Sequence, residues 1–168
     1  MKLKTSERYV GEGMFEEEII FFKVEGINNN EEALEFLSDQ LSSRRVVTES
    51  FKKAIIDREN IFPTGLKLNQ YGVAIPHADP NYVNMNQIAL MTLADPVMFK
   101  RMEDPSLEVQ VNLIIVLALK DPDSQLMTLK ALMNLFQDKE VINSILNFDN
   151  TNKSIIKLKE LLNSNFVI

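Results

Sequence analysis

The residues with the clearest chemical potential lie in one stretch, GVAIPHAD (residues 72–79), which holds the single histidine of the chain, His77. The apolar residues before Pro76 predict a buried strand, which ends there because proline has no N–H to donate to a neighbouring strand. His77 would then lie just past a strand end, where open α/β sheets place their sites. Asp79 could orient one ring nitrogen and leave the other free, and a neutral imidazole is a competent nucleophile near pH 7. The stretch favours a nucleophilic histidine, with an inert, hydrogen-bonded histidine as the alternative.

A second group of polar residues, a short way upstream, suits a phosphoryl group. Phosphoryl transfer needs in-line positioning and donors around the three equatorial oxygens, and an arginine fork matches phosphate geometry. Arg58 lies at the end of a predicted helix, Thr64 offers a hydroxyl and Gly65 allows close backbone approach. The alternatives are a surface ion pair of Arg58 with Asp57 or Glu59, and ordinary turn chemistry for the other two residues.

These two stretches together resemble a known family. DRENIFPTG (residues 57–65) followed by GVAIPH (72–77) is similar to the fructose–mannitol class of enzyme IIA, a phosphocarrier of the bacterial phosphoenolpyruvate-dependent sugar phosphotransferase system (PTS). Gln125 and the helix-like segment that follows it, LMTLKALMNLFQD, add support. The resemblance covers about residues 19–146. The segments IPHADPNYV and FPTGL are most similar to the galactitol-type branch of the family.

The resemblance implies a role for each candidate residue. His77 is expected to be phosphorylated by the histidine phosphocarrier HPr and to pass the group to a sugar-specific IIB component in uptake of a sugar such as galactitol. The membrane component IIC is expected as a partner through IIB. Arg58 falls on the family's active-site arginine and Thr64 on its loop threonine. Gln125 stands where many members carry a second active-site histidine. Its amide can donate to phosphate but cannot become a cation or relay a proton.

Composition excludes several other functions. The chain has 168 residues, no cysteine and a net charge of −6. Thiol catalysis, cysteine-based zinc sites and histidine-rich metal sites are therefore excluded, and nucleic acid is not expected as a partner. No Gly-rich nucleotide loop is present. We expect no cofactor and no metal.

The sequence also predicts a cytoplasmic location without direct membrane insertion. The longest uninterrupted apolar run, residues 113–119, is far too short to cross a bilayer. The first residues, MKLKTSERYVGEGMFEEE, contain no apolar core for a signal peptide.

Hydrophobic periodicity predicts the elements that must position these residues. Strands are expected at residues 19–24, 71–75, 88–93 and 109–119, the last central, with a short edge strand at 97–99 and a loop at 60–70. Helices are expected at 31–42, from an N-cap at Thr48 to residue 59, from Pro122 to Phe136, from a cap at Asp138 to 146, and at 151–162. Residues 1–17 are expected to be loosely held. The order predicts one domain over residues 1–168, with its core at 19–146, folded as a three-layer α/β/α sandwich around a mixed sheet.

In the helix from Pro122, the residues expected to face the core are Leu126, Leu129, Leu132, Met133 and Phe136. Around His77, an apolar docking patch is expected from Ile61, Phe62, Tyr82 and Val83, with loop anchoring in the core as an equal alternative. Two alternatives to a sugar-system phosphocarrier stay open: a regulatory module whose phosphorylation controls a partner protein, and an interaction domain in which His77 is inert.

Overall fold

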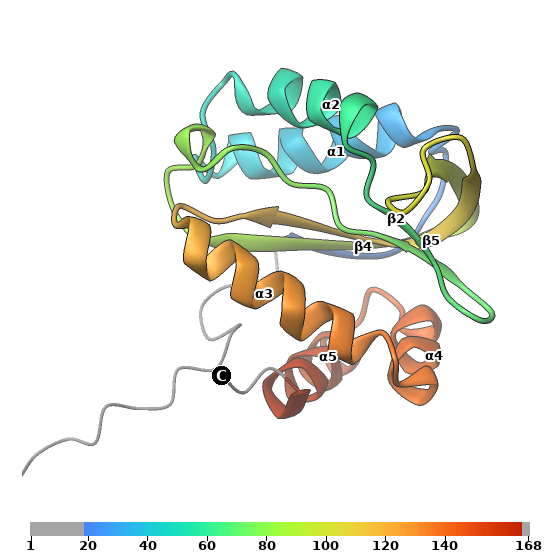
Figure 1. Ribbon diagram of the computed structural model, residues 1–168. Helices are drawn as coiled ribbons and strands as arrows, with labels where there is room; N and C mark the ends of the chain where they lie inside the picture. The colour runs from blue at the N-terminus through green and yellow to red at the C-terminus, as the bar shows by residue number, and fades with distance from the viewer. Residues whose placement is uncertain (1–18, 166–168) are drawn as a thin grey trace, which may run out of the picture.

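The computed structural model describes residues 19–165, with no side chains described beyond 162, and shows a mixed sheet between two layers of helices (Figure 1). The fold class predicted from the sequence is confirmed. In chain order the elements are β1 (Ile20–Val24), α1 (Asn30–Ser43), α2 (Phe51–Ile61), β2 (Gly65–Lys67), β3 (Gly72–Ala74), the 3-10 helix η2 (Pro80–Tyr82), β4 (Gln87–Lys100), β5 (Glu108–Ala118), α3 (Pro122–Leu135), α4 (Lys139–Asn147) and α5 (Asn152–Asn165).

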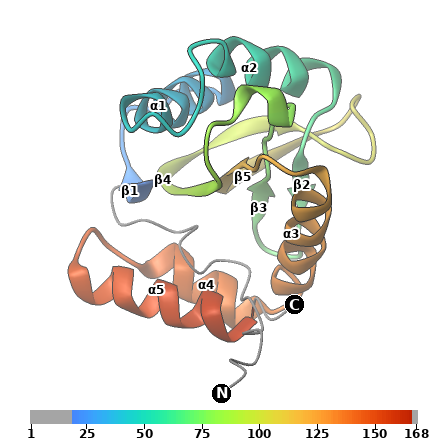
Figure 2. The ribbon, with the colours of Figure 1, turned by 90° about the vertical axis from the view of Figure 1, so that its left-hand side faces the viewer.

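The sheet has five strands in the order β1-β4-β5-β3-β2. β1 pairs with β4 and β3 with β5 in parallel, whereas β4 with β5 and β2 with β3 are antiparallel. β5 is therefore the central strand, as its long apolar run predicts. Helices α1 and α2 cover one face, and α3, α4 and α5 cover the other (Figures 1 and 2).

Side chains of β5 contribute to the core on both faces of the sheet, because successive side chains of a strand point to opposite faces. Ile114, Val116 and Ala118 pack among residues of α1 and α2. Leu113 and Ile115 pack among residues of α3, α4 and α5. A strand buried on both faces thus appears as a continuous apolar run in the sequence.

The predicted loop at residues 60–70 is wrong in part, because its middle forms β2. Gly65 pairs with Ala74, and a Cβ at Gly65 would lie 2.6 Å from the carbonyl oxygen of Lys100. The glycine, which marks a turn in sequence terms, instead permits close approach of two backbones.

The predicted separation of the strands at residues 88–93 and 97–99, across Asp95 and Pro96, is also wrong. Residues 97–99 are not a separate strand but the second half of β4, where Val97 pairs with Val111. A register shift between Thr92 and Val97 absorbs the proline in a bulge, where its missing N–H costs no ladder hydrogen bond.

Two helix predictions are corrected as well. Helix α2 has Ser50 rather than Thr48 at its N-cap, and no side chain caps it. In α3 the buried positions are Thr128, Leu132 and Leu135, while Leu126 and Met133 are exposed. The face of α3 that meets the sheet is thus rotated from the predicted apolar stripe. The predicted cap Asp138 of α4 is confirmed, and Asn29 caps α1; each side chain accepts from backbone N–H of its helix.

Candidate functional site

The predicted nucleophile lies where β3 leaves the sheet. Pro76 follows the strand, and its carbonyl accepts a hydrogen bond from the backbone N–H of Leu117 in β5 at 3.0 Å. His77 forms an isolated parallel bridge with the same leucine. The histidine backbone is therefore held against the central strand, and a proline fixes the residue before it.

The ring of His77 is half-buried and has a defined orientation. Its Nδ1 lies 2.9 Å from the carbonyl oxygen of Ile75. Because a carbonyl oxygen only accepts, Nδ1 carries the ring proton in the neutral imidazole, and Nε2 keeps its lone pair. The nitrogen suited to nucleophilic attack is therefore Nε2.

The surroundings of His77 favour this neutral form. Burial lowers the pKa of the imidazole below its usual 6.5, and the positive charge of Arg58 lowers it further, against the raising effect of the Ile75 carbonyl. Near pH 7 the ring is thus uncharged and can act as a nucleophile. The effect of Arg58 also shows that the structure brings these two predicted site residues near each other.

Arg58 lies in the last turn of α2 and is exposed. Its predicted ion-pair alternatives have other partners: Asp57 pairs with Lys53 at 2.5 Å, and the carboxylate of Glu59 accepts from Thr64. Within residues 19–162 the guanidinium has no ion pair of its own, and its Cζ lies 5.5 Å from the centroid of the Phe62 ring. Its positive charge is therefore available to an incoming anion.

Thr64 is buried, and its polar groups are directed at Glu59. Its backbone N–H donates to Glu59 Oε1 at 2.8 Å, and its hydroxyl donates to Oε2 at 2.9 Å. In this arrangement the hydroxyl hydrogen serves the glutamate, and the predicted contact of Thr64 with phosphate stays a prediction.

Glu59 itself was considered in the sequence only as a surface partner of Arg58, yet it is 4% exposed. Burial raises the pKa of its carboxyl to about 7, against the lowering effects of the Thr64 hydrogen bonds and of the Arg58 charge. One sequence signal was available. An acid in the last turn of a helix lies at the negative end of the helix dipole, so a glutamate there needs another reason.

Gln125 reaches the same site from the N-terminal part of α3. Its Nε2 donates to the carbonyl oxygen of Ala78, the residue after His77, at 3.3 Å. The structure thus brings the predicted Gln125 beside the nucleophile, although the two are 48 positions apart in the sequence.

The predicted docking residues divide into two kinds. Ile61 and Phe62 are 67% and 61% exposed, as docking requires. Val83 is 5% exposed and belongs to the core under α1 and α2, so its docking role is wrong. Tyr82 is half-buried and packs against that core, which favours loop anchoring. Exposed Leu126 follows Gln125 in α3, so a further apolar side chain lies at this end of the molecule.

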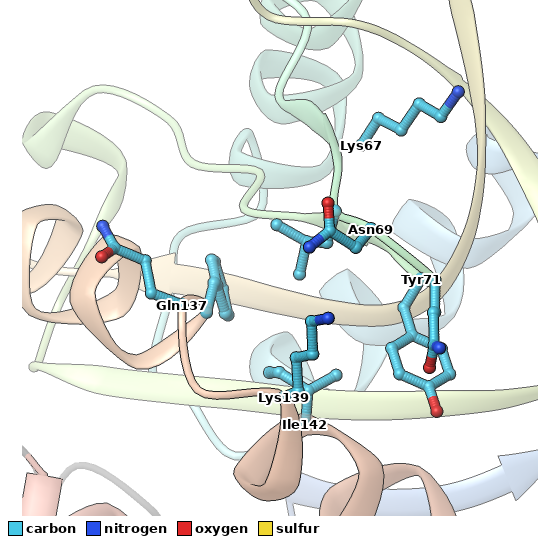
Figure 3. A pocket seen from close by; sticks show the side chains of 9 residues that line it. Lys67, Asn69, Tyr71, Gln137, Lys139 and Ile142 are labelled. Carbon is cyan, nitrogen blue, oxygen red and sulfur yellow. The ribbon is translucent and has the colours of Figure 1, made fainter.

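A pocket of about 320 Å³ lies elsewhere, between the β2–β3 turn and the junction of α3 with α4 (Figure 3). Lys67, Asn69, Tyr71, Gln137, Lys139 and Ile142 are among its lining residues. The pocket lies at the start of β3 and the end of α3, whereas His77 follows the end of β3 and Gln125 lies near the start of α3. A helix the length of α3 spans about 21 Å. The pocket holds none of the predicted site residues.

The described residues lack two other kinds of functional feature. They contain no group of three or more His, Cys, Asp or Glu side chains that could hold a metal ion. None of their helices is long and apolar enough to span a membrane.

The sequence is similar to that of known proteins over most of the chain. Residues 13–160 match the model of the family described as phosphoenolpyruvate-dependent sugar phosphotransferase system, EIIA 2. The galactitol-specific EIIA component of the PTS from Escherichia coli (strain K12) is 29% identical over 133 residues, which are 79% of this chain and 88% of the relative.

Solved structures share the fold. The crystal structure of mannitol IIA from Escherichia coli has a TM-score of 0.67 at 23% identity, covering 84% of this chain and 96% of its own. A complex of the mannitol enzyme IIA with phosphorylated enzyme IIB from the same organism also gives 0.67 at 23% identity, covering 88% of this chain and 99% of the matched one.

Proposed function

This chain belongs to the EIIA 2 family of the phosphoenolpyruvate-dependent sugar phosphotransferase system, and from that premise we propose that it carries a phosphoryl group on Nε2 of His77. The donor is phospho-HPr and the acceptor a sugar-specific IIB component. The observation that carries the proposal is the half-buried neutral imidazole, whose Nδ1 is bonded to the Ile75 carbonyl while the Arg58 charge lies nearby.

The transfer proceeds by in-line displacement. The lone pair of His77 Nε2 attacks the phosphorus, a P–N bond forms to His77, and the P–N bond to the donor histidine breaks. The Nδ1 proton stays in its hydrogen bond to Ile75, which fixes the ring plane throughout. Transfer to the IIB component is the same step in reverse, with His77 as the leaving group.

The residues around His77 supply charge and hydrogen bonds. The Arg58 guanidinium stabilises the phosphoryl oxygens, because a positive group placed where charge gathers lowers the barrier. The Gln125 amide lies near enough to the loop of His77 to turn from the Ala78 carbonyl to a phosphoryl oxygen. Both residues act through charge and hydrogen bonding, and the transfer depends on positioning and electrostatics.

Exposed apolar side chains provide the docking surface. Ile61 and Phe62 precede β2, and His77 follows β3; since Gly65 pairs with Ala74, these two segments leave the sheet at the same end. Transient partners commonly dock on a modest patch with an apolar centre and a polar rim. The IIA–IIB complex of the mannitol relative supports IIB as one such partner, and the membrane component IIC is a partner only through IIB.

The test is phosphorylation in a purified system. Wild-type protein incubated with phosphoenolpyruvate, enzyme I and HPr is expected to gain acid-labile, alkali-stable phosphate, and His77→Ala is expected to gain none. Equal labelling of both proteins, or labelling of neither, would overturn the proposal.

A chase separates a sugar phosphocarrier from a regulatory module. Label on His77 is expected to pass to a IIB component and then to sugar, and the galactitol-specific relatives make galactitol the sugar to try first. Label that stays on His77 in the presence of IIB components and sugars would favour the regulatory alternative.

A further inference from the structure

The chemistry proposed for His77 uses Arg58 and gives no role to the buried acid next to it in the sequence, Glu59. Glu59 is 4% exposed, and it neighbours Arg58 in the last turn of α2. A buried carboxylate is costly unless its oxygens are satisfied. The partners of its two oxygens therefore decide whether a carboxylate is stable at this position.

Both carboxylate oxygens of Glu59 are occupied by one residue. Thr64 donates its backbone N–H to Oε1 at 2.8 Å and its hydroxyl to Oε2 at 2.9 Å. These bonds run from the end of α2 to the residue before β2, and so close residues 59–64 into a loop. Hydrogen bonds to charged groups are worth about twice those between neutral groups.

The far end of this loop is anchored in the sheet. Gly65 pairs with Ala74, and its carbonyl accepts from the backbone N–H of Met102 at 2.9 Å. Thr64 therefore has a fixed position, and the Glu59 bonds transmit that position to the last turn of α2.

The closed loop carries the groups that the proposed transfer uses. Phe62 donates its backbone N–H to the Arg58 carbonyl at 2.7 Å, and its ring lies 5.5 Å from the Arg58 guanidinium carbon. Exposed Ile61 and Phe62 are the proposed docking residues. The position of Arg58 relative to His77 thus depends on the loop that Glu59 closes.

The charged groups around Glu59 come from three elements. Arg58 of its own helix exerts an attractive effect. Lys100 of β4 and Glu108 of β5 line, with Glu59, a cavity of about 310 Å³ on this side of the sheet. Among residues 19–162, neither of these two cations forms a salt bridge with Glu59, so the hydrogen bonds from Thr64 hold its carboxylate.

We propose that Glu59 is a positioning residue for phosphoryl transfer, which clamps Thr64 and so holds Arg58 and Phe62 in place at His77. The proposal rests on the proposed function of His77. When the donor protein is saturating, loss of the clamp is expected to slow transfer mainly by displacing Arg58, and therefore much less in a protein that lacks Arg58.

The experiment is a double-mutant cycle on the single-turnover rate, measured at saturating phospho-HPr on protein shown to be folded by circular dichroism. Glu59→Ala, which removes both acceptors, is expected to lower the rate at least tenfold. In an Arg58→Ala background the same change is expected to lower it less than twofold. Glu59→Gln keeps one acceptor for the Thr64 N–H and is expected to restore the rate to within threefold of wild type.

A matched control and a second probe complete the design. Asp57 precedes Arg58 as Glu59 follows it, and its carboxylate is exposed. Asp57→Asn therefore removes a negative charge next to the arginine without breaking the clamp, and is expected to keep the rate within twofold of wild type. If Glu59→Ala does not fold, Thr64→Val removes the hydroxyl donor with little change of shape and is expected to slow transfer at least threefold, with Thr64→Ser restoring it.

The outcomes are distinct. Equal slowing by the Glu59 and Thr64 changes with and without Arg58 would show a role independent of the arginine and overturn the proposal. No slowing by either change would do the same. A wild-type protein that takes no label from phospho-HPr would instead overturn the proposed function.

Discussion

Replacement of Glu59 by glutamine should change the pH dependence of stability. Burial raises the pKa of this carboxyl from 4.5 to about 7 in the folded protein. Between these values the folded state holds a proton that the unfolded state has lost. Stability therefore falls as pH rises through this window, and the loss is complete above about pH 8. Glutamine has the same shape and does not ionise, so the variant lacks this contribution.

The magnitude follows from the same two values. Each pKa unit is worth about 1.4 kcal/mol, so the interval from 4.5 to about 7 corresponds to about 3 kcal/mol. Between pH 5 and pH 8, the free energy of unfolding of wild type should fall by about 2–3 kcal/mol relative to Glu59→Gln. His77, whose pKa is lowered, contributes with the opposite sign, since its stabilisation grows as pH rises toward 6.5. It is present in both proteins and cancels.

The assay is urea unfolding followed by far-ultraviolet circular dichroism at pH 5, 6, 7 and 8, because the chain has no tryptophan. Asp57→Asn serves as the control, since this exposed residue loses the same charge without burial. Its difference from wild type should stay within about 0.5 kcal/mol at every pH. A difference between wild type and Glu59→Gln that is the same at pH 5 and pH 8 would refute the reasoning.

Three further predictions concern other parts of the site and its frame. Arg58→Ala should slow single-turnover phosphorylation about 100-fold, as removal of one charge-stabilising group does. The free energy of unfolding in urea should stay within about 1 kcal/mol of wild type, because this exposed side chain has no ion pair among residues 19–162. A loss above about 2 kcal/mol would instead indicate a structural role. Gly72→Ala should lower the free energy of unfolding by about 3 kcal/mol or more, since the added Cβ would lie 1.9 Å from the carbonyl oxygen of Gln110. A urea midpoint equal to that of wild type would contradict this close packing. The His77 imidazole should titrate below pH 6.5, and its neutral form should carry the proton on Nδ1. Nitrogen NMR can measure both properties without ambiguity, because the chain has a single histidine. A midpoint above 6.5 would show that burial does not set the pKa of this ring.

Much of this arrangement could be predicted from the sequence because its signals are local. The helix caps at Asn29 and Asp138 are set by side chains three residues or fewer from the N–H groups they accept from. The apolar run of β5 reports burial on both faces without knowledge of its neighbours. The motif predicted His77 and Arg58 as site residues, and the structure brings these two near each other.

What failed or was missed depended on contacts between distant segments. β2 was predicted as loop because its strand character comes from pairing with β3 and from packing against Lys100. Glu59 looked like a surface acid because only the return of the chain to Thr64 buries it.

The sequence by itself determined the helices, the apolar strands and the identity of the single imidazole, because periodicity and residue type are properties of short segments. Only the tertiary structure decided which nitrogen of His77 is free, that Arg58 is left without an ion pair within residues 19–162, and that Gln125 meets the Ala78 carbonyl. These properties depend on burial and on hydrogen-bond partners, which are set when segments far apart in the chain pack together.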